Sequence, residues 1–413
     1  MKLILTACGV MTCTALAHAQ PQYDFIKIDS WNANPLAGEA FAWDVSDSGV
    51  VCGEATMDNR IGTPGFIWTQ ALGKVEIPVI HPKEVSNAGL VVGLAAVYDI
   101  NTHQAWSPPA LPGTYYSPSF GGVNEAGLAV GTISGCSCSD SGGVTNVPYL
   151  WDAEGGPRGL PFIIPNARGL SRVNNSGVAI GWLNGWQANE GFVTDLNTGA
   201  FTVLTDVLPQ GLSPGFARAL DINNHGDVLG TCPGNGLVYR YTFIYSPTTG
   251  VQVLPLPGAG YQQQLSGYGM NDAGTVVGSI TSPIATEFAM VYTPARGIQN
   301  LNDASLVAGI PAGYRLRVAM RVSNTGWIVG NGAQGSKNTG WVLVPRGAAC
   351  DPIDFNHDGL FPDTQDIDDF LSVFSGGPCP TGTCGDIDFN NDGLFPDTAD
   401  IESLLRVFSG GAC

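Results

Sequence analysis

Basic residues and histidine are scarce in this chain of 413 residues. It has 17 Lys and Arg against 35 Asp and Glu, a formal net charge of −18 at pH 7, and only 5 His. A nucleic-acid-binding surface needs Lys and Arg to neutralise phosphates, so this balance argues against a nucleic-acid partner. Beyond the N-terminal segment no apolar run approaches the roughly 18 residues of a membrane span, so we expect no transmembrane segment there.

Two common catalytic motifs are absent as well. The sequence contains no His-Glu-x-x-His zinc helix and no Gly-x-x-x-x-Gly-Lys-Ser/Thr phosphate-binding loop. These absences remove the simplest local routes to a metalloprotease or a P-loop nucleotide-binding enzyme. An enzyme built from repeated units can still assemble its site from residues of separate units, so a catalytic function is not excluded.

The first residues have the pattern of a secretory signal. Met1-Lys2 precedes an apolar run that ends in Ala17-His18-Ala19, which predicts a signal peptide over residues 1–19. A lipoprotein interpretation would use Cys8, but too few apolar residues precede it. We therefore predict a secreted protein that is extracellular or associated with the cell surface.

A short signature recurs seven times between residues 45 and 330: an apolar residue, Ser or Asn, a polar residue, a variable residue, Gly, three mainly apolar residues and a second Gly. The Ser or Asn side chain can bond to its own backbone and the first Gly can take positive φ, so each copy predicts a β-hairpin. The seven turn glycines are Gly49, Gly89, Gly127, Gly177, Gly226, Gly274 and Gly326. Apolar segments such as 65–68 and 242–245 predict a third strand, and segments such as 201–204 and 298–301 predict a fourth.

The spacing of these units predicts the fold of residues 20–346. Four short strands per unit, with 38 to 52 residues between turn glycines, match the blade period of a β-propeller. We therefore predict an all-β seven-bladed propeller with almost no helix. The seventh unit ends at Pro345 without a fourth strand, and an unassigned strand over Tyr23–Ile28 precedes the first unit. We expect that strand to complete the last blade and close the ring, which removes exposed sheet edges.

These units resemble the HAF-type extracellular repeats of exported bacterial proteins, which pair such a hairpin with a later aromatic strand. The resemblance covers residues of about 23–345. The aromatic strand here has Gly65-Phe66 or Gly191-Phe192 where the family has its His-Ala-Phe triplet. Because the motif consists of structural positions, the resemblance implies architecture and an extracellular location, and little about chemistry.

The last 64 residues contain one acidic segment written twice. Asp354-Phe-Asn356-His-Asp358-Gly and Asp388-Phe-Asn390-Asn-Asp392-Gly each place oxygen side chains at loop positions one, three and five and a glycine at six. This is the pattern of an EF-hand-like calcium loop. Residues 350–413 carry thirteen Asp or Glu against Arg406 alone, which favours cation binding. Apolar residues at helical spacing follow each loop and end at Ser-Gly-Gly, which predicts two helices.

This tail, residues 350–413 after a linker at 347–349, resembles a dockerin. The resemblance implies two Ca2+ sites and a cohesin-like partner protein. The loops are one residue longer than the family pattern, and the helix faces with Phe361 and Phe395 would contact the partner. The ligands implied for the first site are Asp354, Asn356, Asp358, the Leu360 carbonyl, Asp363 and Asp366, and those for the second are Asp388, Asn390, Asp392, the Leu394 carbonyl, Asp397 and Asp400.

Cysteine usage fits an exported chain. Of ten cysteines, Cys8 and Cys13 lie in the signal segment, which leaves eight. Four of these bracket the two calcium repeats, and the duplication favours pairing 350 with 379 and 384 with 413; pairing 350 with 413 and 379 with 384 is the alternative. Cys136-Ser-Cys138 lacks a second ligand pair, so we expect a loop disulfide rather than a zinc site. Cys52 and Cys232 fall in predicted strands, where we expect buried thiols.

One ring of equivalent positions carries charge. Five residues before the seven turn glycines stand Asp44, Glu84, Gly122, Arg172, Asp221, Gly269 and Arg321. On inner strands these residues would face one another, either as a carboxylate–arginine catalytic site or as salt bridges between blades. We favour the salt bridges, because ion pairs commonly occur without catalysis.

The tryptophans divide into two groups. Trp182 and Trp186 flank Asn184-Gly185 in an insertion of the fourth unit and are candidates for a saccharide-stacking platform. The second group recurs at one strand position and is predicted core: Trp68, Trp106, Trp151 and Trp341. The sequence as a whole predicts a non-catalytic repeat protein that presents a propeller surface to a protein or glycan ligand and is attached by its calcium module. The alternative is a glycan hydrolase or lyase anchored in the same way.

Overall fold

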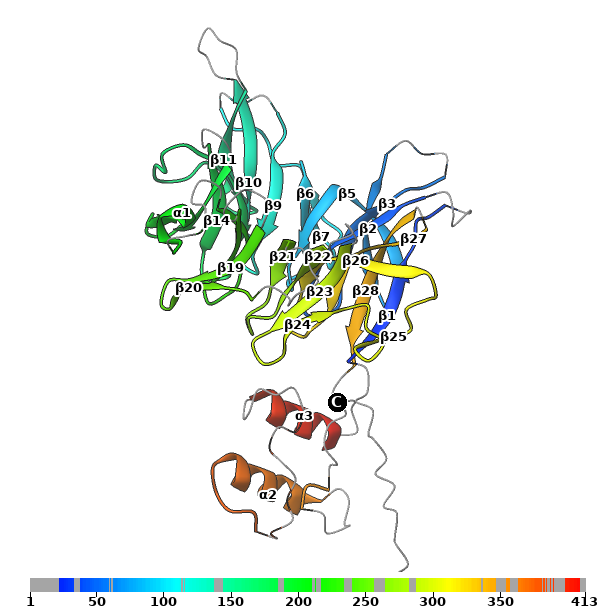
Figure 1. Ribbon diagram of the computed structural model, residues 1–413. Coiled ribbons are helices and arrows are strands. Elements are labelled where there is room, and N and C mark those ends of the chain that lie inside the picture. Colours follow the sequence, from blue (N-terminus) through cyan, green and yellow to red (C-terminus); the bar gives the residue numbers. More distant parts are fainter. Residues whose placement is uncertain are drawn as a thin grey trace, which may run out of the picture.

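The computed structural model describes most of the predicted propeller and part of the C-terminal module (Figure 1). The described residues are 22–32, 38–58, 60, 62–112, 114, 116–136, 144–184, 189–209, 212, 217–233, 240–255, 264–281, 287–335, 337–346, 354–356, 363–380, 382, 384, 387, 389 and 398–408. The predicted signal peptide and the 347–349 linker lie outside them. No helix in these segments has the length and apolar character needed to cross a membrane.

Each repeat forms a run of antiparallel strands that begins with an inner strand ending at the turn motif. The inner strands are β2 (Ala40–Val45), β5 (Gly73–Val85, whose last residues play this role), β9 (Ser119–Val123), β13 (Ala167–Val173), β17 (Arg218–Ile222), β21 (Gln264–Met270) and β26 (Tyr314–Val322). The second strands are β3 (Val51–Ala55), β6 (Leu90–Leu94), β10 (Ala129–Cys136), β14 (Val178–Asn184), β18 (Val228–Pro233), β22 (Val276–Thr281) and β27 (Ile328–Gln334).

The third and fourth strands follow as the apolar segments predicted. The third strands are β4 (Pro64–Thr69), β7 (Val97–Asp99), β11 (Val144–Asp152), β15 (Asn189–Asp195), β19 (Arg240–Ser246), β23 (Glu287–Thr293) and β28 (Lys337–Pro345). The fourth strands are the first part of β5, β8 (Ala105–Trp106), β12 (Gly156–Arg158), β16 (Phe201–Val203), β20 (Gly250–Val253) and β24 (Gly297–Asn300). Helix is limited to the four-residue α1 (Leu204–Val207) in this region, which confirms the prediction of a nearly helix-free domain among the described residues.

The repeat turns have the predicted chemistry. All seven turn glycines have φ between 73° and 87°, a region where a side chain would be strained. In each turn the Ser or Asn side chain accepts a hydrogen bond from the backbone N–H four residues later, as from Val178 to Asn174 at 2.8 Å and from Val50 to Ser46 at 3.1 Å. The signature therefore encodes the hairpin through glycine geometry and one local side-chain bond.

The N-terminal strand closes the last repeat, as predicted. β1 (Tyr23–Ile28) pairs antiparallel with β28 in a six-residue register that runs from Tyr23 opposite Pro345 to Ile28 opposite Gly340. A short strand, β25 (Val307–Ala308), adds to its outer edge in parallel. An ion pair between Arg346 and Asp24 at 2.7 Å holds the same two ends together. The chain thus joins its first and last repeats through backbone hydrogen bonds over more than 300 residues of sequence.

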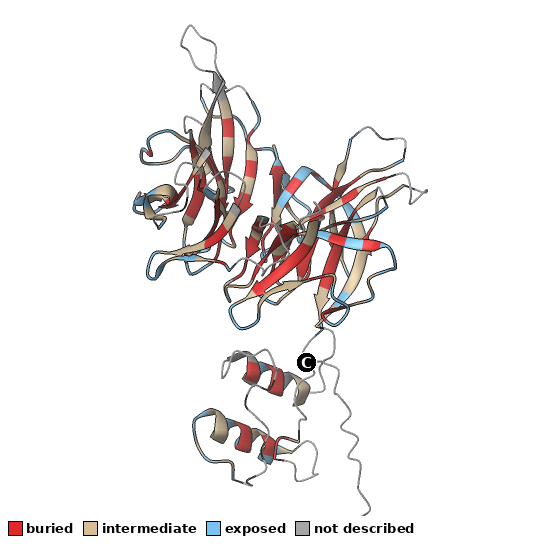
Figure 2. Cartoon of the chain, viewed as in Figure 1, coloured by how far each residue is buried: buried red, intermediate tan, exposed pale blue. Residues whose placement is uncertain are grey.

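The apolar core lies between neighbouring repeats rather than at one centre. Clusters of buried apolar side chains join the second and third strands of one repeat to the inner strand of the next. In one of them Val329 and Val342 pack with Ala42. Buried residues follow the strands and exposed ones the connecting turns (Figure 2). Trp68, Trp151 and Trp341 are buried as predicted, whereas Trp106 is half-buried and contacts Trp151 at 5.6 Å between ring centroids.

Both free cysteines in strands are buried, which confirms their assignment. Cys52 and Cys232 are at most 1% exposed and form no disulfide. Burial raises the pKa of Cys232 to about 11 and that of Cys52 well above its usual range. Both therefore stay protonated and unreactive in the folded protein. The Cys138 thiol and the side chain of Cys136 lie outside the described residues.

The C-terminal module contains the two predicted helices. They are α2 (Thr364–Phe374) and α3 (Thr398–Phe408). Asp363 caps α2 with a capping box completed by Asp366, and Gly376 follows its end at φ 84°. Phe370 and Leu404 are fully buried in a small core with Phe355 and Phe389. The same apolar position on each helix thus forms the core of the module.

The favoured cysteine pairing is wrong. Cys379 forms a disulfide with Cys384, with 5.8 Å between their Cα atoms, rather than with Cys350, so Cys384 is not free to pair with Cys413. A turn at Gly382, whose N–H donates to the Cys379 carbonyl at 3.3 Å, brings these two cysteines together. This bond belongs to the alternative pairing. Cys350 and Cys413 lie outside the described residues.

Candidate functional site

The seven turns are linked in a closed hydrogen-bonded circle. The residue after each Ser or Asn donates its backbone N–H to the side-chain oxygen of the equivalent residue in the next repeat, and the seventh donates to the first. We call these residues the turn ring. The bonds run from Asp47 to Asn87 (2.7 Å), Asn87 to Glu125 (3.0 Å), Glu125 to Asn175 (3.0 Å), Asn175 to Asn224 (3.1 Å), Asn224 to Asp272 (2.8 Å), Asp272 to Asn324 (2.9 Å) and Asn324 to Asp47 (2.7 Å).

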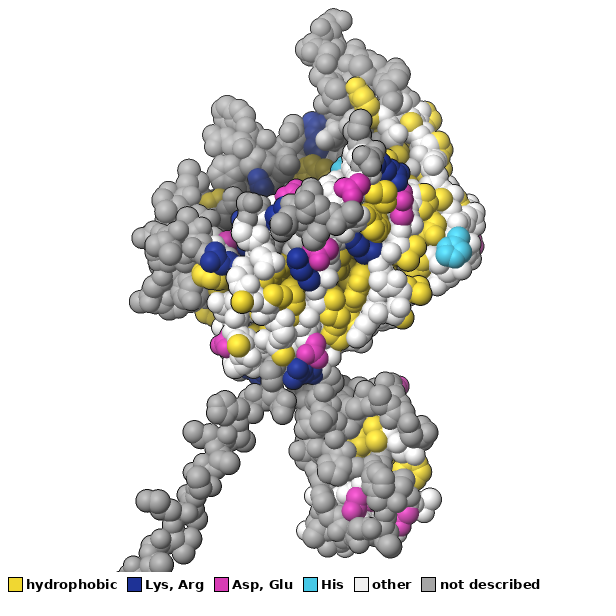
Figure 3. Space-filling model, turned by 90° about the vertical axis from the view of Figure 1, so that its right-hand side faces the viewer, with side chains coloured by type: hydrophobic (Ala, Val, Ile, Leu, Met, Phe, Trp, Pro, Cys, Tyr) yellow, Lys and Arg dark blue, Asp and Glu magenta, His cyan; other side chains and the backbone are white. Residues whose placement is uncertain are grey.

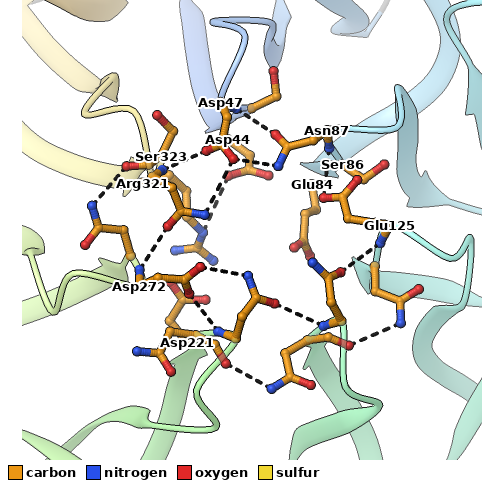
Figure 4. Close-up of a pocket in the computed structure, with 18 of the residues that line it drawn as sticks. Asp44, Asp47, Glu84, Ser86, Asn87, Glu125, Asp221, Asp272, Arg321 and Ser323 are labelled. Atoms are coloured by element: carbon orange, nitrogen blue, oxygen red, sulfur yellow. Dashed lines mark hydrogen bonds and ion pairs between the residues drawn. The ribbon is translucent and has the colours of Figure 1, made fainter. Parts of the chain in front are cut away.

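The turn ring surrounds a polar cavity, which we call the axial cavity. It encloses about 130 Å³ and is lined by residues of all seven repeats. Figure 4 shows the turn side chains converging on it from every side, with their hydrogen bonds following its rim. Asp47, Glu125 and Asp272 supply carboxylates to that rim, and all three are engaged with backbone N–H groups of neighbouring turns.

Four of the predicted charged ring residues line this cavity, and the fifth, Arg172, contacts two of them. We call Asp44, Glu84, Arg172, Asp221 and Arg321 the charged waist. Arg172 Nη1 lies 2.8 Å from Glu84 Oε2 and its Nε 3.7 Å from Asp221 Oδ1, while Arg321 Nε lies 3.8 Å from Asp44 Oδ1. Every one of these pairs joins different repeats, and no side chain of the waist is more than 19% exposed.

Backbone groups complete the bonding of the waist. The carboxylates of Asp44 and Asp221 accept N–H groups of the next repeat from Val85 at 2.9 Å and Met270 at 2.8 Å. Arg172 also donates to the Gly121 carbonyl, and Arg321 to the Tyr268 carbonyl, both in the preceding repeat. The two arginines, Asp44 and Asp221 are therefore bonded to the repeats on both sides, and these partners are what a buried charge requires.

The two glycines of the ring make room for the arginines. A Cβ on Gly122 would lie 2.8 Å from the Arg172 Cα and from Glu84 Oε2, and one on Gly269 would lie 2.9 Å from the Arg321 Cα. Gly122 therefore allows Arg172 to reach past its own neighbouring repeat to Glu84. Each arginine of the ring thus follows a ring position that is occupied by glycine, and the packing of the waist requires this order.

Burial shifts the titration of the waist carboxyls upward. Desolvation raises the pKa of Asp221 to about 7, and the Arg172 guanidinium only partly offsets this. Desolvation likewise raises the pKa of Glu84 and Asp44, again opposed by Arg172. Two guanidinium groups face three carboxyl groups in the waist, and the neighbouring carboxylates of Asp44 and Asp221 add to the upward shift of the Glu84 pKa.

A second cavity lies along the inner strands beside Arg172. It encloses about 270 Å³ between the second and fifth repeats. Lys83, Phe120, Ser171, Arg172 and Trp182 are among the residues that line it, and we call it the Trp182 cavity. Of the predicted saccharide platform, the structure thus places Trp182 at a cavity, while Trp186 lies outside the described residues.

The first predicted calcium site is only partly described. Asn356 and Asp366 are buried, and Asp366 accepts N–H groups from Asn356 at 3.4 Å and Asp363 at 3.1 Å. Among described residues neither Asp366 nor the buried Asp369 has an ion pair with Lys or Arg. Asp358 and Leu360 lie outside the described residues, and within the described part no group of three metal-binding side chains converges.

The second predicted calcium site falls almost entirely outside the described residues. Of its ligands only Asp400 is described, and it is fully buried on α3 at the position equivalent to Asp366 on α2. The undescribed ligands are Asp388, Asn390, Asp392, Leu394 and Asp397.

Two features were missed by reasoning from the sequence. The turn ring was one, although every copy of the signature has an oxygen-bearing side chain after its Ser or Asn, and that regularity was the available signal. The other was Lys83, which stands beside Glu84 in the sequence but lines the Trp182 cavity. Its signal was a departure from the other repeats, none of which has a charged residue at that position.

Comparison with known proteins supports the fold. No family model and no curated protein sequence matches this chain. Oligogalacturonate lyase from Vibrio parahaemolyticus is structurally similar, with a TM-score of 0.53, 10% identity and coverage of 78% of this chain and 97% of the lyase. An oligogalacturonate lyase in complex with manganese has a TM-score of 0.52 and 9% identity, with coverage of 79% of this chain and 98% of the lyase. The β-propeller domain of the Trilobed protease from Pyrococcus furiosus has a TM-score of 0.45 and 12% identity, with coverage of 64% of this chain and 82% of that domain's chain. At these identities the likeness concerns fold alone: the chain is mostly β and propeller-like.

Proposed function

We propose that this protein is a secreted, non-catalytic seven-bladed propeller that presents a binding surface and is attached to an extracellular or cell-surface assembly by a calcium-dependent, dockerin-like module. The observation that carries the non-catalytic part is the bonding of the charged waist. Its arginines and carboxylates are each paired with other repeats at 2.8–3.8 Å. A site prepared for catalysis would instead direct such groups toward a substrate.

The charged waist and the turn ring have a structural role in holding the repeats together. Each waist ion pair and each turn-ring hydrogen bond joins residues of different repeats. Such contacts align seven units that otherwise touch only their neighbours. The HAF resemblance of the repeats agrees with this structural role, and it supports an extracellular location. The exterior face in Figure 3 mixes acidic, basic and apolar side chains, without a broad area of one charge.

Calcium attachment rests on the duplicated loops and on their buried carboxylates. Asp366 and Asp400 stand at equivalent positions, both fully buried. A hard cation bound by side-chain and backbone oxygens would compensate this buried negative charge. The apolar side chains of Leu371 and Leu405, which are 42% and 48% exposed at equivalent helix positions, offer a surface for a cohesin-like partner.

A pull-down with the mature chain tests attachment. The bait is residues 20–413, exposed to envelope and medium fractions of the source organism with calcium or with chelator. We expect one partner to be captured only with calcium, and capture to be lost in the variant Asp366→Asn combined with Asp400→Asn. Asp368→Asn is the matched control, because Asp368 is exposed on the same helix and is not a predicted ligand. Equal capture by all variants in both conditions would refute the proposal.

The second candidate is a glycan hydrolase or lyase anchored by the same module. It is favoured by the raised pKa values of the waist carboxyls beside Arg172, which is a pattern of acid–base sites. The two oligogalacturonate lyases of similar fold make oligogalacturonates the first substrates to assay. Turnover that disappears in Glu84→Gln, with an unchanged melting temperature, would establish this candidate over the first.

A further inference from the structure

The Trp182 cavity is opened by small residues at one repeated position. The inner strands carry a β-bulge or irregularity just before the ring position. The residues at that position are Trp43, Lys83, Gly121, Ser171, Leu220, Tyr268 and Met320. Repeats one, six and seven therefore place large side chains there, whereas repeats three and four place Gly121 and Ser171, which leaves room for the cavity. Bulges commonly redirect side chains beside functional sites.

Two departures from the repeat pattern meet in this space. Lys83 is the one charged residue among the seven bulge positions. Trp182 is the one aromatic residue at the position after the second glycine, where the other repeats have Glu54, Leu94, Thr132, Thr231, Ser279 and Asn331. The hairpin and the inter-repeat bonds form in the other repeats without Lys or Trp there. These two side chains are therefore available for a function other than folding.

The indole of Trp182 is held in place beside the cavity. Gly169 lies opposite it on β13, and a Cβ on Gly169 would come within 2.3 Å of the Trp182 ring. The missing side chain lets the ring lie against the strand, and the residue remains only half-buried. A fixed, partly exposed aromatic ring at a cavity is suited to stacking against the apolar face of a sugar.

The ionisable side chains that line the Trp182 cavity are both cationic, although the chain has a net charge of −18. Lys83 is exposed and makes no ion pair with any described residue; its ammonium lies 5.0 Å from the Trp43 ring centroid. Arg172 uses Nη1 and Nε in the waist, while its Nη2 makes no hydrogen bond or ion pair within the described segments. The cavity thus offers two cationic donors to an anion.

We propose that the Trp182 cavity binds one unit of an acidic saccharide, with its ring against Trp182 and its carboxylate or sulfate facing Lys83 and Arg172 Nη2. A space of about 270 Å³ lies just under the range of roughly 300 Å³ and above that is usual for small-molecule sites, which suits a single sugar ring. The Ser171 hydroxyl lines the same space and can bond to sugar hydroxyls. This inference rests on the proposed role of the propeller as a binding surface and specifies its ligand.

Calorimetric titration of the mature chain tests the inference. The probes are a uronic acid trisaccharide, a sulfated trisaccharide and a neutral trisaccharide. The reference is the affinity of the unmodified protein for the acidic probe that it binds better. We expect the neutral probe to bind the unmodified protein at least about tenfold more weakly than this reference. We expect the same loss for either acidic probe with the variants Lys83→Gln and Trp182→Leu. Lys27→Gln is the control for charge, since Lys27 lies on β1 and pairs with Asp29 at 2.8 Å. It should leave binding unchanged.

The outcomes separate this inference from the proposed function. Binding of an acidic probe without turnover supports both, and preference between the uronate and the sulfate identifies the anion. Binding with turnover overturns the non-catalytic proposal but keeps the saccharide site. Equal binding of the neutral probe, no loss in Lys83→Gln and Trp182→Leu, or no binding of either acidic probe at millimolar concentration overturns the inference itself.

Discussion

Removing the guanidinium of Arg172 should destabilise the propeller in a strongly pH-dependent way. Arg172 is 9% exposed and bridges Glu84 and Asp221 across three repeats. Arg172→Met keeps much of the side-chain volume but leaves two buried carboxyls without their cation. Breaking a buried pair from one side costs about 3–5 kcal/mol, which is the loss we expect at pH 8. For a domain of this size that corresponds to roughly 5–10 °C in melting temperature.

The sign of the pH dependence follows from the raised pKa values. The waist carboxyls titrate higher in the folded protein than in the unfolded chain, with Asp221 at about 7. The folded state then binds more protons than the unfolded state, so the stability from these groups is greatest at low pH and is lost as pH rises through the folded pKa. Without Arg172 these pKa values rise further. At pH 5 the carboxyls of the variant are protonated, and we expect a loss of only about 1–2 kcal/mol.

The assay is urea unfolding followed by circular dichroism at pH 5 and pH 8, with the variant compared to the unmodified protein at each pH so that other groups cancel. Arg315→Met is the control, because Arg315 is exposed on β26, the inner strand of another repeat, and forms no ion pair with a described residue. Adding Glu84→Gln to Arg172→Met should recover part of the loss at pH 8. An equal loss at both pH values would refute the reasoning, since it would show that packing rather than charge carries the effect.

Three further predictions follow from the same geometry. Glu84→Gln alone should leave the free energy of unfolding at pH 8 within about 1 kcal/mol of the unmodified value or increase it, because two guanidinium groups then face two carboxylates. The same urea unfolding assay measures this, and a loss above about 3 kcal/mol would contradict it. Gly122→Ala should cost about 1–3 kcal/mol, since its Cβ would lie 2.8 Å from the Arg172 Cα, whereas Gly159→Ala, in open space, should be nearly neutral in thermal melts; similar melting temperatures would contradict the packing argument. Cys52 should react with a thiol reagent only in denaturant, and rapid modification of the native protein would show that its strand is not buried.

Local features of the sequence determined the repeat, the turns and the closing strand. Each hairpin depends on a glycine with positive φ and on a Ser or Asn whose side chain bonds to the backbone four residues ahead. Both lie within five residues, so the hairpin can be predicted from the sequence of the turn itself. The missing fourth strand of the last repeat and the unpaired Tyr23–Ile28 segment likewise predicted the closure, because an exposed edge is costly. The two helices after the acidic loops followed from apolar spacing and glycine ends.

The tertiary structure alone decided which side chains meet. Equivalent ring positions could be listed from the sequence, but only packing shows that Arg172 passes Gly122 to reach Glu84, 88 residues away. The Cys379–Cys384 bond depended on a turn that the duplicated pattern did not reveal. Lys83 and Trp182 share a cavity because two small bulge residues separate them. The physical reason is one of range: backbone preference and hairpin bonds act between near neighbours in the chain, whereas ion pairs, disulfides and cavities depend on distances that exist only after the repeats have closed into a ring.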